Sequence, residues 1–158
     1  MIITILIFIL ILGLLVFVHE FGHFITAKKS GVRVEEFGFG LPPRAIGIQK
    51  KDGKWRLVKS GYSAEKEPET ATVYSLNWIP LGGFVKIKGE EGGAASDADS
   101  FAGKPIWKRA IILSAGVTMN FILAAALLAF GFGIGLPQAW EAADLSRATV
   151  RARNTQIV

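Results

Sequence analysis

The chain has 158 residues, of which 51% are hydrophobic, and it carries a formal net charge of +5 without any cysteine. Its positive mean hydropathy is unusual for a soluble domain of this size and indicates a membrane protein. The lack of cysteine excludes disulfides and thiolate metal sites, and because no basic-aromatic block stands out, we expect the positive charge to face a lipid bilayer, with no nucleic acid as partner.

Residues 1–27 form the first predicted element, a transmembrane helix. They read MIITILIFILILGLLVFVHEFGHFITA and would span about 40 Å as a helix, enough to cross a hydrocarbon core of about 30 Å. A cleaved signal peptide is the alternative. It would need a basic start, a shorter apolar stretch and a small-residue cleavage site, and the segment has none of these.

The motif HEFGH at residues 19–23 interrupts this apolar run with the chain's only two histidines. On a helix, His19 and His23 lie on one face, so both imidazoles can ligate one metal ion, and Zn²⁺ suits this ligand type. Glu20 is rotated by about 100°, which suits proton transfer from activated water to a leaving amine. The motif therefore predicts amide hydrolysis, with His19 and His23 as zinc ligands and Glu20 as the catalytic base.

Two other interpretations of HEFGH are open. Chance spacing of this kind should occur roughly once in a thousand comparable chains. A structural role is also possible, in which Glu20 sits at the membrane interface and the histidines only bond neighbouring helices. An ionisable residue inside a membrane helix costs about 2.5–3.5 kcal/mol on insertion scales and is functional by default, which favours the metal site.

Residues 28–88 are predicted to form a β-rich cytoplasmic and membrane-associated segment. The stretch RAIGIQKKDGKWRLV predicts a hairpin around Asp52-Gly53, and TVYSLNWIPLGGFVKIKG predicts a second, unusually apolar hairpin at residues 73–88. This second hairpin could wall the polar cavity that intramembrane hydrolysis needs, and its edge could pair with an extended substrate. An ordinary core role is the equally open alternative.

The remaining segments are an acidic linker, a second membrane helix and a tail. Residues 89–104 are small and acidic and predict a flexible linker. Residues 105–137 combine an interfacial segment, anchored by Trp107, with a second transmembrane helix. In that helix Gly116 and Asn120 form G-x-x-x-N: the glycine permits close helix approach, and Asn120 either bonds across helices or steadies a substrate carbonyl. Residues 138–158 predict an exterior tail.

Positive charge predicts the orientation of the chain. Basic residues follow the first helix and precede the second, which by the positive-inside rule places the middle segment in the cytoplasm and both termini outside. Arginines in the tail oppose this assignment but lie farther from the membrane. The basic residues that flank the two predicted helices are Lys28, Lys29, Arg33, Lys104, Lys108 and Arg109.

Together these motifs resemble the site-2 protease family, the zinc intramembrane metalloproteases, and in particular the bacterial branch with periplasmic PDZ domains. The resemblance runs from about residue 5 to residue 137 through FVHEFGHF, FGFG, IPLGGFVKI, FAGKPIWKRAIILSAG and G-x-x-x-N. It implies His19 and His23 as zinc ligands and Glu20 as base. It also implies substrate contacts near Gly82, Gly83 and Phe84, and Asn120 as a catalytic group that supports substrate or transition state.

The resemblance implies an integral protein of the bacterial inner membrane that cleaves transmembrane segments of other proteins, such as anti-sigma factors or signal-peptide remnants. The family's third zinc ligand is an Asp in an L-D-G motif, and this chain has no such motif and no carboxylate within residues 110–136. We therefore expect an amino-terminal half whose tail leads to a PDZ-like domain. The alternative is a truncated or degenerate relative that acts as a non-catalytic membrane binding or assembly subunit.

Overall fold

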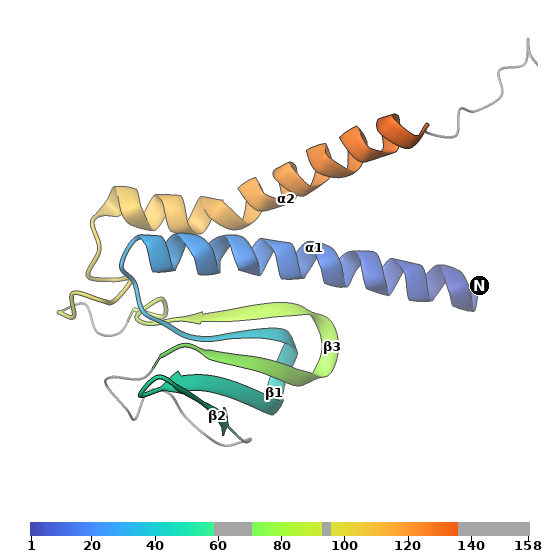
Figure 1. Cartoon of the computed structure of the whole chain (residues 1–158). Helices are drawn as coiled ribbons and strands as arrows, with labels where there is room; N and C mark the ends of the chain where they lie inside the picture. The colour runs from blue at the N-terminus through green and yellow to red at the C-terminus, as the bar shows by residue number, and fades with distance from the viewer. Residues whose placement is uncertain (59–70, 93–95, 136–158) are drawn as a thin grey trace, which may run out of the picture. The chain divides into compact units, whose positions relative to one another are not determined.

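The computed structural model describes residues 1–58, 71–92 and 96–135, so the predicted tail at 138–158 lies outside the described residues. The elements follow in the order α1 (Ile2–Lys29), β1 (Val34–Lys51), β2 (Lys54–Val58), β3 (Val73–Ile87) and α2 (Ile106–Ile134) (Figure 1). The chain divides into two compact units, Met1–Ala124 and Ala125–Val158. The first unit holds α1, the sheet and the beginning of α2, and all the contacts described below belong to it.

Both predicted helices are present, and both are long and apolar enough to cross a membrane. Large apolar side chains along the first half of α1 are exposed, with Ile3 at 73% and Leu10 at 70%. Such a surface is unfavourable in water and favourable in hydrocarbon. The helices end close to the predicted bounds, because continuous hydropathy is a strong local signal.

The first predicted hairpin is confirmed. Strands β1 and β2 pair antiparallel, with Lys51 opposite Lys54, so the turn consists of two residues. Asp52 and Gly53 both have positive φ, at 52° and 77°. A two-residue turn of this kind matches the twist of the flanking strands and favours the Asp-Gly pair.

The second predicted hairpin is wrong in its pairing. Residues 73–87 are one bent strand, and its two halves pair with β1 instead of with each other. Phe37 of β1 lies between them, opposite Tyr74 on one side and Val85 on the other. Strand β1 also bends, near Gly40, where φ is +82° and a Cβ would lie 2.5 Å from the carbonyl oxygen of Ile79. Alternation predicts a strand but not its partner, and so it missed this arrangement.

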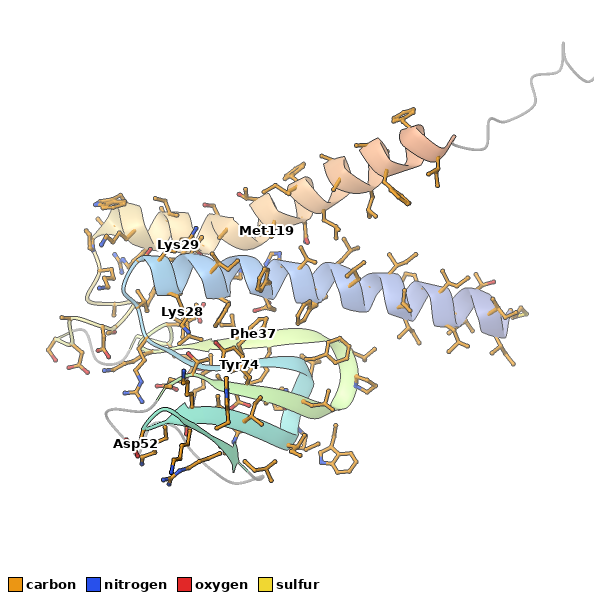
Figure 2. The ribbon with its side chains drawn as sticks, in the orientation of Figure 1. Lys28, Lys29, Phe37, Asp52, Tyr74 and Met119 are labelled. Atoms are coloured by element: carbon orange, nitrogen blue, oxygen red, sulfur yellow. The ribbon has the colours of Figure 1, made fainter. Side chains whose placement is uncertain are left out.

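One face of the sheet packs against α1 through aromatic rings. The ring of Phe37 lies 4.5 Å from that of Phe24 and 5.6 Å from that of Phe17, measured between centroids. Figure 2 shows Phe37 on the side of the sheet that faces α1. The Lys28 ammonium lies 5.9 Å from the Tyr74 ring centroid. Asp52 lies at the far turn of the sheet in the same view. The aromatic packing places the sheet beside the helix that carries HEFGH.

A second core joins the ends of the elements. It contains buried apolar residues of α1, β1, β3 and α2 and of the segment before α2. That segment is also hydrogen-bonded to residues that flank β1 and β3. The Arg33 amide donates to the Asp99 carbonyl at 2.8 Å and the Phe101 amide to the Lys88 carbonyl at 2.8 Å. The described part of the predicted linker therefore includes a docked stretch. The buried residues of this core are Ala27, Val32, Val34, Ile87, Phe101 and Ile112.

Candidate metal centre

The two histidines of HEFGH point at one place on α2. Their ring centroids are 4.9 Å apart. A Cβ built on Gly116 would lie 2.5 Å from the Nε2 atom of His19 and 2.5 Å from the Nε2 atom of His23. Zinc–nitrogen bonds are about 2.0–2.1 Å long, so the space left by the missing side chain at position 116 fits a metal ion between the two nitrogens.

His23 is held in the orientation that ligation needs. Its Nδ1 atom lies 2.7 Å from the backbone carbonyl oxygen of Ile112. A carbonyl only accepts hydrogen bonds, so Nδ1 must carry the proton and donate it. The lone pair of a neutral imidazole is then on Nε2, which faces Gly116 and is available to a metal.

His19, on α1, has a polar neighbour on α2. Its Nδ1 atom lies 3.4 Å from the side-chain nitrogen of Asn120. The side-chain oxygen of Asn120 is buried and has no hydrogen-bond partner among the described residues. The structure thus places Asn120 behind the imidazole of His19.

Glu20 lies between the histidines and the sheet. It is half-buried, it is close enough to both histidines to interact with them electrostatically, and it hydrogen-bonds with the backbone N–H of Val85 in β3. Its carboxylate therefore stands beside the two histidines and against the strand that was expected near the substrate. This placement suits a base that serves both water and a bound peptide.

Glu90, just after β3, was not predicted as part of the centre. Partial burial raises the pKa of its carboxyl, while the proximity of His23 acts in the opposite direction. The local sequence around Glu90 contains no motif that predicts its role. The residue comes close to His23 only through the tertiary fold. The carbonyl of Ile112 was missed for a similar reason, since every residue has one.

Glycine allows the two helices to touch at the centre. A Cβ on Gly22 would lie 2.5 Å from the carbonyl oxygen of Ala115 and 2.7 Å from Cγ of Met119. Figure 2 shows Met119 on the side of α2 that faces α1. The predicted close approach at Gly116 is therefore correct, and Gly22 is its counterpart on α1.

The predicted substrate residues lie on β3 in two environments. A Cβ on Gly82, where φ is +69°, would lie 2.6 Å from Val16, and one on Gly83 would lie 3.0 Å from the Phe17 ring. Both glycines thus contact α1 about one turn before His19. The Phe84 ring instead lies near Gly38 of β1. Substrate contact by these three residues stays a prediction.

Among the described residues, the candidate metal ligands are His19 and His23. No group of three or more His, Cys, Asp or Glu side chains that could hold a metal occurs in residues 1–58, 71–92 and 96–135. A catalytic zinc usually has three protein ligands and a water. The two histidines fit the metal, and the described residues add no third His, Cys, Asp or Glu ligand to them.

Comparison with known proteins identifies relatives of this chain. The chain is 39% identical over 125 residues to a "Putative zinc metalloprotease" of Fusobacterium nucleatum, covering 79% of this chain and 31% of the relative. It is 38% identical over 133 residues to the protease RseP of Yersinia pestis, covering 82% of this chain and 26% of that protein.

The chain spans between a quarter and a third of the length of these relatives. The model of peptidase family M50 matches residues 7–156, which include HEFGH, the sheet and the G-x-x-x-N face of α2. The chain therefore belongs to peptidase family M50, the site-2 protease family.

Proposed function

We propose that this chain supplies two zinc ligands and the catalytic base of a zinc-dependent endopeptidase that cleaves transmembrane segments of membrane proteins. The convergence of both Nε2 atoms on the space above Gly116 carries the proposal. Membership of family M50 and the names of the relatives support it. Anti-sigma factors and signal-peptide remnants are the substrate classes that the family resemblance suggests.

Each residue has a distinct task in this proposal. His19 and His23 hold the metal through Nε2, and the Ile112 carbonyl fixes the ring of His23. Bound zinc would polarise the scissile carbonyl and make water acidic enough to react at neutral pH. Glu20 takes the proton of that water and delivers it to the departing amine.

The substrate would approach along β3. Gly82 and Gly83 have no side chains, and the strand that contains them lies against α1 near Glu20. A peptide bond in a helix is shielded, so a transmembrane substrate must be extended before cleavage, and an extended peptide can pair with a strand edge. Gly82 and Gly83 would keep the strand close against α1, and so beside Glu20, while the substrate pairs with the strand edge.

The proposal also places the chain in a membrane. Helices α1 and α2 would span the bacterial inner membrane, with the sheet on the cytoplasmic side and both termini outside. Lys28 and Lys29 in the last turn of α1 support this orientation, as do Lys108 and Arg109 in the first turns of α2.

The test is the substitution Glu20→Gln in the whole protein to which this chain belongs. We expect cleavage of a membrane-protein substrate to be abolished while zinc stays bound, because glutamine cannot accept the proton. Asp52→Asn makes the same acid-to-amide change at an exposed turn and should leave cleavage unchanged. Continued cleavage by Glu20→Gln would contradict the proposal.

The alternative function is a non-catalytic membrane binding or assembly subunit. The observation in its favour is the absence of a three-ligand cluster in the described residues. It predicts that substrate binding survives Glu20→Gln and that the unmodified whole protein releases no cleaved product. Cleavage that a zinc chelator stops and added zinc restores would rule it out.

A further inference from the structure

We infer that Asn120 is a positioning residue for His19: its side-chain oxygen accepts the Nδ1 proton of His19 and so leaves the Nε2 lone pair free for a metal. The inference deepens the proposed function, because it rests on His19 as a metal ligand. It gives Asn120 a role different from the substrate contact that the sequence suggested.

The first step concerns the proton of His19. Its Nε2 atom and that of His23 point at the same space above Gly116. A proton on Nε2 of His19 would occupy the position that a metal needs. A neutral His19 that ligates must therefore be the Nδ1–H tautomer, and this N–H needs an acceptor.

The second step concerns the amide of Asn120. Its nitrogen faces Nδ1 of His19 at 3.4 Å, and its oxygen is buried without a partner among the described residues. Two N–H donors facing each other are repulsive, and a buried oxygen without a partner is unfavourable. Rotation of the amide by 180° exchanges oxygen and nitrogen in nearly the same space, and it removes both problems at once.

The third step concerns the arrangement along α2. Ile112, Gly116 and Asn120 are four residues apart, so they lie on one face of the helix. The Ile112 carbonyl accepts from Nδ1 of His23, Gly116 leaves the metal space, and Asn120 does for His19 what Ile112 does for His23. This face of α2 thus fixes the tautomer of both ligands.

The position of Asn120 also argues against direct contact with the substrate. It touches Nδ1, which is separated from Nε2 by the width of the imidazole ring. The amide therefore acts behind the ligand and not in the space where water and peptide would react. A residue that sets the ring and tautomer of a ligand typically changes metal affinity by 10–100-fold.

The experiment uses this chain in detergent micelles with three variants. Asn120→Ala removes the side-chain oxygen that would accept the Nδ1 proton of His19, and Asn120→Asp retains an oxygen at that position. Thr118→Ala is the matched control, because its hydroxyl donates to the Ser114 carbonyl of the same helix. Zinc affinity is measured by chelator competition, and the tautomer of His19 is read from the ¹⁵N NMR shifts of its ring in the metal-free chain.

We expect Asn120→Ala to weaken zinc binding by about 10–100-fold and to shift His19 towards the Nε2–H tautomer. Asn120→Asp and Thr118→Ala should retain the Nδ1–H tautomer and bind zinc within a few-fold of the unmodified chain. Unchanged affinity and tautomer in Asn120→Ala would overturn the inference, as would equal losses in Asn120→Ala and Asn120→Asp.

The two readouts separate this inference from the proposed function. If the unmodified chain binds no zinc, the proposed role of the histidines fails, while the ¹⁵N shifts of the metal-free chain still decide the role of Asn120. If Asn120→Ala does not fold, the unmodified chain alone gives a decision, because a dominant Nε2–H tautomer of His19 would overturn the inference.

Discussion

At the scale of single residues, the centre depends on glycine at position 116, which has no side chain. Gly116 leaves the space towards which both imidazole Nε2 atoms point, each 2.5 Å from where a Cβ would be. The helix spacing of His19 and His23 made it predictable that the two imidazoles lie together, since helix periodicity is local. The role of the Ile112 carbonyl and the approach of Glu90 were not predictable, because both arise from tertiary packing.

Substitution of Gly116 by alanine should abolish zinc binding. The added methyl group would overlap both Nε2 atoms and displace the rings. Alanine favours a helix over glycine by about 1 kcal/mol, so lost helicity would not explain the result. Gly133→Ala is the matched control, since a Cβ at this other glycine of α2 meets nothing within 4 Å. Zinc per chain, measured by mass spectrometry, should fall only in Gly116→Ala; retention there would contradict this geometry.

At the scale of elements, the sequence predicted the helices and the Asp52-Gly53 turn but not the pairing of β3. Hydropathy and turn chemistry act within a few residues. The partner of a strand depends on long-range contacts, and here the bend of β1 near Gly40 gives both halves of β3 an available edge. That bend places Val85 against Glu20, and so it completes the surroundings of the base.

The contact between α1 and α2 provides a test at this scale. In Gly22→Ala the new methyl group would meet the Ala115 carbonyl oxygen at 2.5 Å, which is backbone and cannot rotate away. Overpacking of this kind costs about 1–3 kcal/mol and should move the helices apart. We expect a lower thermal midpoint and weaker zinc binding. Gly13→Ala on the same helix makes only an ordinary contact of 3.4 Å with Gly82 and should leave both unchanged.

The stretch docked before α2 predicts a pH dependence of stability. The Lys88 ammonium lies 2.6 Å from Asp99 and holds the pKa of that carboxyl below its ordinary value. The pair therefore stabilises the fold fully above the ordinary carboxyl pKa, and the effect is lost as the pH falls through the lowered pKa. Asp99→Asn should remove this part of the pH dependence.

Because both Lys88 and Asp99 are partly exposed, we expect the loss in Asp99→Asn to be no more than about 1 kcal/mol. Thermal unfolding followed at several pH values would measure it. Asp52→Asn is the control, since Asp52 is exposed and lies 4.0 Å from Arg56. Identical pH profiles for Asp99→Asn and the unmodified chain would show that the Lys88 pair does not stabilise this stretch.

At the scale of the whole molecule, the open question is orientation in the membrane. The chain contains no cysteine, so a single introduced thiol reports one position. Lys54→Cys, at the exposed end of the β1–β2 turn, should be labelled by a membrane-impermeant reagent in inverted vesicles and not in intact spheroplasts. The reason is the basic charge next to both helices, which by the positive-inside rule favours a cytoplasmic sheet. Labelling in intact spheroplasts and not in inverted vesicles would place the sheet outside the cytoplasm and contradict this orientation.

The central claim is that His19 and His23 hold zinc between α1 and α2. The most direct measurement is the zinc content per chain after purification in detergent, with His23→Ala as the comparison. We predict near-stoichiometric zinc in the unmodified chain, with water completing the metal's coordination, and little zinc in His23→Ala. A zinc-free unmodified chain, or equal zinc in both proteins, would contradict the claim.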